Sequence, residues 1–350
     1  MSESRLASLD QYRGYTVAGM FVVNWLGAFA FTPEILKHHR TWCSYADTIM
    51  PQFFFAAGFA LRLVWLKLAA GSTRAAYSRM LRRGIGLFIF GVIFYQFGDQ
   101  WKSWTELHDA GWQGFLSLRV WGQPFQALVH IAVTGLWILP VIGKSGPARV
   151  LYAAASAGIH LWISHAFWFE TLIKERVIDG GPPGFLTWTL PAMAGTLAFD
   201  AVRSGMPLRR MVLWSLLMMA GGWGLSCLSN GGVLAAPPFF ANTRPHDLWT
   251  MSQKAGSTSY LLFSAGFSLL AYAAFRAACD LRGLRLTLFQ DLGSNALAAY
   301  VLHNLIMDFC SAFAPKDSPA WWGITIGALH FGLVWWMVRW LNGRGIHLRL

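Results

Sequence analysis

Residues 12–32 read YRGYTVAGMFVVNWLGAFAFT, an apolar stretch as long as a helix must be to cross a lipid bilayer. Its only charged residue, Arg13, stands at the beginning. Similar stretches recur along the chain, and together they predict about ten membrane-spanning helices. The expected spans are residues 12–32, 46–66, 84–100, 122–142, 150–170, 185–202, 210–228, 257–276, 291–311 and 320–340.

The composition supports a membrane protein. Of the 350 residues, 55% are hydrophobic and only 13% are charged, whereas a soluble domain has about a quarter charged residues. The 19 tryptophans argue against a disordered chain. A chain of this kind cannot cover a water-facing surface, so we predict an all-α, polytopic transmembrane helix bundle.

The distribution of charge predicts the orientation of the bundle. The net charge of +12 is spread over short clusters between apolar runs. That pattern argues against nucleic acid as a partner and is typical of membrane topology. Placing both the N-terminus and the C-terminus in the cytoplasm puts most Lys and Arg residues on the inner side. No low-complexity linker divides the chain, so residues 1–350 are expected to form a single domain.

Two further features bear on the compartment and on metals. The sequence has no cleavable signal peptide and no N-x-S/T sequon, and we expect a bacterial inner (plasma) membrane protein. The four cysteines show no paired spacing, so we expect no metal site.

Polar side chains within apolar sequence are the candidates for function, because they are costly at membrane depth unless they have a partner. Most also have a structural interpretation: a lone histidine often only packs, and Asn295 could cap a helix. The Arg-rich segment 74–83 is first of all a topology signal. The candidates are Asn24, His38, His39, Asp47, Gln126, His130, His160, Asn295, His303, Asn304, Asp308 and His330.

The His38–His39 pair stands out because Asp47 follows at a membrane boundary and Asn24 lies on the helix before it. An imidazole suits proton transfer near neutral pH. A carboxylate can fix its tautomer, and an amide can donate to an oxyanion. A purely structural His–Asp contact is the alternative interpretation.

The same residues resemble the heparan-α-glucosaminide N-acetyltransferase-like membrane acyltransferases. RLASLDQYRG opens like that family, and VVN follows within the first apolar helix. The next family block, H-x-x-W followed by A-D-x-x-x-P-x-F-x-F-x-x-G, resembles residues 39–58. Weaker similarities follow in order: GQPFQALVHIAV, PPGFLTWTLPAMAGTLAFDAVR, LWTMSQKAGSTSYLLFSAG and LGSNALAAYVL.

The resemblance implies transfer of an acetyl group from cytoplasmic acetyl-CoA to an amino sugar or glycan at the opposite face. It implies that His39 is the catalytic base, that Asn24 is the Asn of the V-N motif and that Asp47 is the A-D aspartate. His38 offers a rival alignment. The gap between Trp42 and Asp47 is shorter than in the family, and the usual acidic residue before G-L-L is absent at 183–185.

We expect acetyl-CoA to bind as the acyl donor through basic residues, which contact its phosphates, and through two amide side chains from the weaker motifs. We expect no metal. These candidates are Arg13, Arg74, Arg79, Arg82, Arg83, Gln126 and Asn295. The resemblance also leaves a homodimer open.

Three alternatives remain at this stage. Catalysis could pass through a covalent acetyl-histidine. The chain could be a multi-span transporter of a sugar or small organic solute, because transporters also bury polar residues among their helices. A relative that has lost activity is the third.

Overall fold

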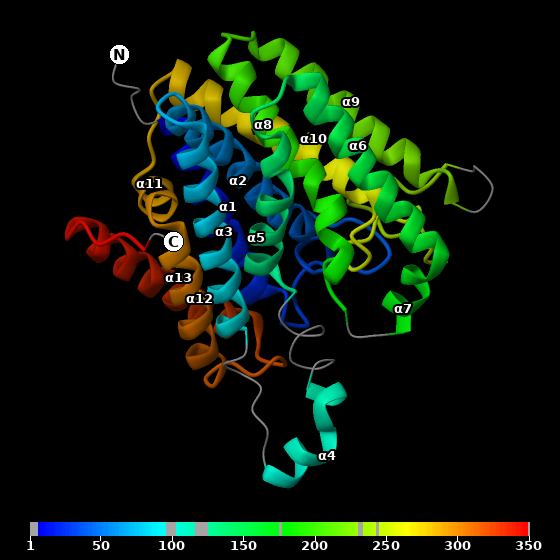
Figure 1. Ribbon diagram of the computed structural model, residues 1–350. Helices are drawn as coiled ribbons and strands as arrows, with labels where there is room; N and C mark the ends of the chain where they lie inside the picture. The colour runs from blue at the N-terminus through cyan, green and yellow to red at the C-terminus, as the bar shows by residue number, and fades with distance from the viewer. Residues whose placement is uncertain are drawn as a thin grey trace.

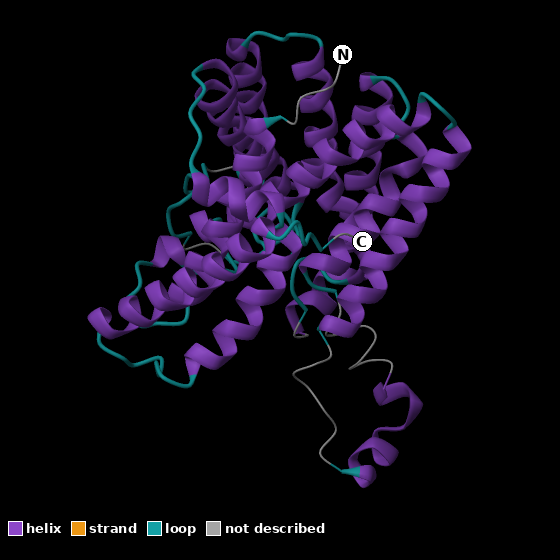
Figure 2. Ribbon diagram, turned by 90° about the vertical axis from the view of Figure 1, so that its left-hand side faces the viewer, coloured by secondary structure: helices purple, strands orange, loops and turns teal. Residues whose placement is uncertain are grey.

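The computed structural model describes residues 6–95, 103–115, 125–174, 177–229, 234–242 and 245–348. Within these ranges the secondary structure is helical, without strands. The α-helices are α1 (Ala7–Leu26), α2 (Tyr45–Ala69), α3 (Thr73–Phe94), α4 (Trp104–Phe115), α5 (Ala127–Ile138), α6 (Gly146–Ile163), α7 (Phe169–Lys174), α8 (Phe185–Arg203), α9 (Leu208–Ser226), α10 (Thr258–Phe275), α11 (Thr287–Ser294), α12 (Ala296–Ser311) and α13 (Ala320–Gly343). The helices other than α4 form one bundle, and α4 stands apart from it (Figures 1 and 2).

Shorter helical turns extend or connect these helices. The 3₁₀ turns are η1 (Glu34–Leu36), η3 (Leu139–Val141) and η5 (Pro182–Gly184), and the π-helical turns are η4 (Ser164–Trp168) and η7 (Arg276–Leu281).

Each predicted span overlaps helical residues, although the boundaries differ. The ninth, 291–311, is not one helix: it covers the end of α11 and all of α12, and the helix breaks at Asn295. Helix α1 ends at Leu26, six residues before the predicted limit, because the apolar residues that follow fold back into a loop. In this loop Phe29 packs against Trp25 and is buried. Helix α3 begins at Thr73, capped by Ser72, because the Arg-rich stretch is itself helical. Residues 96–100 and 122–124 of the third and fourth predicted spans lie outside the described residues.

Five of the described helical stretches are long and apolar enough to cross a membrane. These are Tyr45–Ala69, Gly146–Lys174, Pro182–Arg203, Thr258–Leu281 and Ala320–Gly343. The total of ten spans and the cytoplasmic position of both termini stay predictions.

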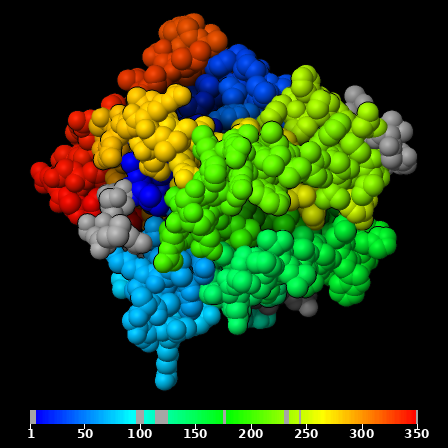
Figure 3. Space-filling view, turned by 90° about the horizontal axis from the view of Figure 1, so that it is seen from above, coloured from blue at the N-terminus to red at the C-terminus, as the bar shows by residue number. Residues whose placement is uncertain are grey.

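The outward faces of the peripheral helices are apolar. Exposed side chains follow α3 at Leu81, Ile85, Ile89 and Ile93, and α9 and α13 present similar faces. In water such surfaces would cause association, whereas in a bilayer they match the lipid chains. The fold is therefore that of a helical membrane protein. In Figure 3, α3 and the α8–α9 connection stand beside the first residues of α1 at one end of the bundle.

Close helix packing in the centre depends on small residues. A Cβ atom at Gly58 of α2 would lie 1.9 Å from the Ala192 carbonyl oxygen of α8, and one at Gly195 would lie 2.0 Å from that of Phe55. These reciprocal contacts bring the two backbones together, as small residues do in membrane bundles. Helices α2 and α8 thereby form a firm frame, and both begin at the end where the candidate site lies.

Candidate functional site

Three loops meet at the end of the bundle where α2, α8 and α10 begin. The backbone N–H of Phe239 donates to the Cys43 carbonyl oxygen at 2.9 Å, joining the loop before α2 to the loop before α10. The N–H of Gly180 donates to the Lys254 carbonyl oxygen at 2.9 Å, joining the loop before α8 to the same segment. The polar candidates near this junction are therefore held by backbone contacts among all three loops.

Asp47 is fixed at the N-terminus of α2 by a capping box. Its backbone N–H donates to Ser44 Oγ at 3.2 Å, and its Oδ2 accepts from the Ser44 backbone N–H at 2.9 Å. The carboxylate is fully buried, and the helix N-terminus favours its negative charge. The Tyr260 hydroxyl of α10 donates to the Asp47 carbonyl oxygen at 2.6 Å. One carboxylate oxygen, Oδ1, is left for another partner.

That partner is His38, whose Nδ1 lies 2.8 Å from Asp47 Oδ1. Because an ionised carboxylate only accepts hydrogen bonds, Nδ1 carries the proton and Nε2 keeps its lone pair when the ring is neutral. The His38 side chain is 47% exposed, so this nitrogen can be reached. Partial loss of hydration lowers the pKa of His38, but the hydrogen bond and charge of Asp47, with help from Asp179 and Gln253, raise it above its ordinary value overall.

Asp179 and Gln253, which also raise the pKa of His38, form with His38 and Asp47 a cluster of four polar residues, and neither was among the candidates expected from the sequence. Gln253 Nε2 donates to Asp179 Oδ1 at 3.1 Å. Asp179 is 5% exposed, and burial raises the pKa of its carboxyl to about 6. The detectable signal was the turn sequence DGGPPG at 179–184, since Asp followed by Gly marks a position with positive φ. An acidic residue thus stands in the loop before α8, where the family block seemed to lack one.

His39 occupies a different environment from His38. Its Nε2 lies 2.7 Å from the Glu34 carbonyl oxygen, and because a carbonyl only accepts, Nε2–H is the donor. The ring stacks on Trp42 with 3.9 Å between the ring centres. The carboxylate that was expected to orient His39 contacts its neighbour instead, and this contact favours the rival alignment through His38.

Asn24 belongs to a second polar group, among the helices. Its Nδ2 lies 3.3 Å from His303 Nε2 of α12, and His303 Nδ1 lies 3.2 Å from His330 Nε2 of α13. Both rings are buried, with Phe21 stacked on His303 and Trp25 on His330. The printed contacts of Asn24 thus connect it to the C-terminal helices and not to either histidine of the loop.

The candidates for acetyl-CoA binding are spread over the molecule. Asn295 is buried between α11 and α12, where its Nδ2 donates to the Ile346 carbonyl oxygen and its Oδ1 accepts from the Leu348 N–H. Gln126 is the N-cap residue of α5. The arginines lie toward the end of the bundle opposite to His38: Arg13 is half-buried on α1, and Arg74, Arg79, Arg82 and Arg83 are exposed on α3.

The same far end holds a buried ionic group that the sequence analysis did not predict. Asp200 of α8 accepts hydrogen bonds from Arg62 of α2 and from Arg149 of α6. Arg62 also donates to the Ile142 carbonyl oxygen. Two guanidinium groups share one carboxylate here, and the group ties three helices together.

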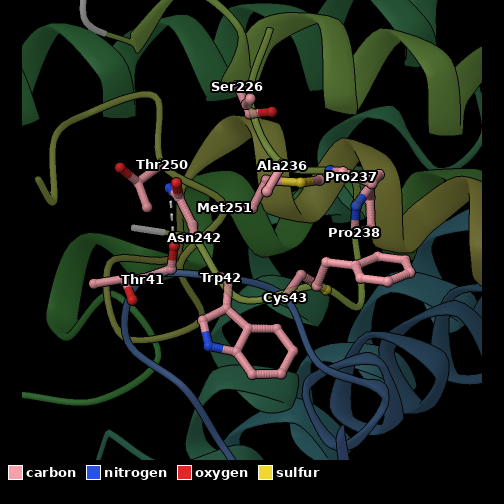
Figure 4. A pocket seen from close by; sticks show the side chains of 12 residues that line it. Thr41, Trp42, Cys43, Ser226, Ala236, Pro237, Pro238, Asn242, Thr250 and Met251 are labelled. Carbon is pink, nitrogen blue, oxygen red and sulfur yellow. Dashed lines mark hydrogen bonds between the residues drawn. The ribbon is translucent and has the colours of Figure 1, made fainter. Parts of the chain in front are cut away.

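A small pocket lies beside the cluster, between the loop at 41–43 and the segment at 235–251 (Figure 4). Its cavity volume is only about 10 Å³, room for about one water molecule. Asn242 Nδ2 donates to the Thr41 carbonyl oxygen at 3.4 Å across its edge, and Trp42 contributes to its wall. Within the described part of the chain, no three His, Cys, Asp or Glu side chains gather as a metal ion would require.

The apolar helices with lipid-facing surfaces define an integral membrane protein. Within it, residues 5–108 match the family described as "Heparan-alpha-glucosaminide N-acetyltransferase, catalytic". The match confirms the resemblance found in the sequence: the chain is heparan-α-glucosaminide N-acetyltransferase-like over just under a third of its length. His38, His39 and Asp47 fall inside the matched residues, whereas Asp179 and Gln253 fall outside. A comparison with curated proteins finds no match.

Proposed function

We propose that this protein is a membrane acetyltransferase that moves an acetyl group from cytoplasmic acetyl-CoA to an amino sugar or glycan at the opposite face. The observation that carries the proposal is the His38–Asp47 pair, with 2.8 Å between Nδ1 and Oδ1, inside the matched segment. A buried carboxylate that fixes the tautomer of an accessible imidazole is the arrangement that general-base catalysis requires.

In the proposed reaction, Nε2 of His38 removes the proton of the acceptor amine or hydroxyl as that group attacks the thioester carbonyl carbon. A bond forms between the acceptor atom and this carbon, and the carbon–sulfur bond then breaks. The coenzyme leaves as a thiolate and takes the proton back from the His38 imidazolium. Asp47 stabilises the imidazolium through Oδ1 and does not itself take a proton, as in other His–Asp pairs.

The donor is proposed to bind with its phosphates near the arginines of the far end. Asp47 and Arg62 mark the two ends along α2, and their separation is about 22 Å at the helical rise per residue. The extended arm of acetyl-CoA would span this distance inside the bundle. Arg13 and the four exposed arginines of α3 (Arg74, Arg79, Arg82 and Arg83) remain the proposed phosphate contacts.

The proposal is tested with purified full-length protein in lipid nanodiscs, acetyl-CoA and a panel of amino sugars and neutral sugars. Release of coenzyme A thiol and the mass of the sugar products are measured together. A transporter would release no thiol, and it would instead carry labelled sugar into sealed vesicles. An acetyl-histidine route would leave labelled acetyl on protein incubated with acetyl-CoA alone.

The neighbouring histidines provide a matched pair of variants for the base. We expect His38→Ala to lower kcat by about 10²–10⁴-fold, the usual contribution of a general base, and His39→Ala to keep most of the activity. The opposite result would return the role to His39, as the family pattern implies. Full activity in both variants would exclude general-base catalysis by this loop.

A further inference from the structure

A second small pocket lies where the end of α6 meets the start of α10, and none of the four residues of the His38 cluster lines it. Its cavity volume is about 10 Å³, which is room for about one water molecule. His160 and Ser164 line it from the α6 side, and Ser257 and Thr258 line it from the α10 side. The other lining residues are apolar: Leu161, Phe169, Leu172, Leu248 and Ala255.

His160 brings a buried ring nitrogen to this pocket. The residue is 3% exposed, and its Nδ1 lies 3.4 Å from Ser164 Oγ. Its other ring nitrogen, Nε2, is buried and has no hydrogen-bond partner among the described residues. Because nearly all buried polar atoms in proteins are hydrogen-bonded, Nε2 requires a polar ligand.

The side-chain hydroxyl of Thr258 is in the same situation. Its Oγ1 is buried and has no hydrogen-bond partner within the described part of the chain. The hydroxyl of its neighbour Ser257, the N-cap residue of α10, is engaged, because it accepts from the N–H groups of Ser252 and Tyr260 at 3.1 and 3.4 Å. Thr258 is therefore the lining hydroxyl that can serve a ligand, together with His160 Nε2.

The backbone of α6 departs from regular helical geometry beside this pocket. The helix continues at Ser164 into the π-helical turn η4, and such turns are frequent at functional sites. The whole stretch Gly146–Lys174 is long and apolar enough to cross a membrane. At membrane depth bulk water does not satisfy a polar atom, so the partner of His160 Nε2 has to be a bound molecule.

The size and the chemistry of the pocket favour water as that molecule. A metal ion needs more donors than one imidazole and one hydroxyl provide, and an ion would find no Lys, Arg, Asp or Glu in the lining to balance its charge. Water both donates and accepts hydrogen bonds, so it suits either tautomer of the ring together with a hydroxyl. Two polar partners are also about the minimum that a buried water needs.

We propose that His160 Nε2 and Thr258 Oγ1 bind one water molecule, which links the end of α6 to the start of α10. Helix α6 packs chiefly against α8, and the bound water gives it a second connection. The water also lies against the loop that carries Gln253, because Ala255 and Ser257 of that loop line the pocket. The inference does not depend on the reaction that the protein catalyses.

Cryo-electron microscopy of the full-length protein in nanodiscs, at a resolution that shows ordered water, tests the site directly. We expect one density peak about 2.7–3.2 Å from both His160 Nε2 and Thr258 Oγ1. The peak should disappear in Thr258→Val and remain in Thr258→Ser, which keeps the hydroxyl. A direct hydrogen bond between His160 and Thr258, density from a lipid or detergent molecule, the absence of a peak, or a peak that survives in Thr258→Val would overturn the inference.

Thermal unfolding of the same protein tests whether the two side chains share one partner. Thr258→Val and His160→Phe each leave the other polar atom without its bridge, and each should lower Tm by about 2–4 °C. The double variant should lose no more than the larger single loss, because it removes both polar atoms. Additive losses, or an unchanged Tm in Thr258→Val, would contradict a shared water.

Thr325→Val is the matched control for these variants. It removes an exposed hydroxyl that donates to the Trp321 carbonyl oxygen of its own helix, so Tm should stay within about 1 °C of that of the unaltered protein. A loss as large as that of Thr258→Val would show that the effect does not come from the pocket. Where His160→Phe does not fold, the comparison of Thr258→Val with Thr258→Ser decides alone.

Discussion

At the scale of single residues, the two carboxylates that raise the pKa of His38 lie in opposite environments. Asp47 has hydrogen bonds to both oxygens and sits at a helix N-terminus. Asp179 has one hydrogen-bonded oxygen and a pKa raised to about 6 by burial. Asp47 therefore orients His38, whereas the pKa of Asp179 lies closer to neutral pH.

The raised pKa of His38 predicts the pH dependence of the reaction. As a base, His38 must be neutral, so kcat/KM should rise with pH through an apparent pKa above about 6.5. In Asp47→Asn the contribution that raises the pKa is lost while burial still lowers it, so the acidic limb should move to lower pH. The rate at the plateau should fall because the tautomer is no longer fixed. A pH–rate profile of both proteins measures this, and an unmoved limb would contradict the role of the pair.

The buried carboxylate of Asp179 should cost stability, because the hydrogen bond from Gln253 offsets only part of its lost hydration. An acid whose pKa is raised in the folded state binds its proton more tightly there, so the stability gain appears as pH falls through about 6 and is absent at neutral pH. Asp179→Asn should therefore stabilise the protein by about 1–3 kcal/mol at pH 7.5. The gain should vanish near pH 4. Thermal unfolding in detergent at both pH values tests this, and destabilisation at pH 7.5 would contradict it.

At the scale of elements, the N-terminus of α2 has two roles: it begins the helix and it positions a residue of the site. The capping box that begins this helix also holds the carboxylate that contacts His38. Pro51 follows within the helix and has no N–H for the Asp47 carbonyl oxygen, which accepts from the Tyr260 hydroxyl instead. The start of α2 therefore determines where Asp47 lies.

Ser44→Ala should separate the two roles of this cap when it is compared with Ser72→Ala. Each substitution removes an N-cap hydroxyl, from α2 and α3 respectively, and each should cost about 1 kcal/mol of stability. Only Ser44→Ala should also lower kcat, because only that cap holds Asp47. Thermal unfolding and turnover are measured on both variants. Equal activity losses would show that the effect is one of general stability.

The helices were largely predictable from the sequence because their signal is local. A run of apolar residues favours a helix wherever it folds, and the ten expected segments all overlap helical residues, although the ninth is divided between α11 and α12. The boundaries were less predictable, since Thr73–Arg83 is charged and still helical. The site was only partly predictable: His38 and Asp47 are nine positions apart, but Asp179 and Gln253 reach them only through packing of distant loops. Asn24 likewise contacts His303, 279 positions away, only because distant segments pack together.

At the scale of the whole molecule, the proposed reaction requires the two ends of the bundle to face different compartments. The loops around His38 should face outward, and the arginines of α3 should face the cytoplasm. Exposed Glu170 and exposed Ser204 lie at these opposite ends. In intact cells, a membrane-impermeant maleimide should label Glu170→Cys at once and Ser204→Cys only after permeabilisation. The reverse pattern would invert the predicted topology.

The contacts of the matched segment reach far beyond it. Asp47 is held by Tyr260, and Asn24 by His303 of the last third of the chain. A fragment of residues 5–108 would carry both loop histidines yet leave the Asn24 amide and the Asp47 carbonyl without their counterparts. Inserting that fragment into another helix bundle would therefore not transfer the activity. The partner residues on α10 and α12 would have to be included.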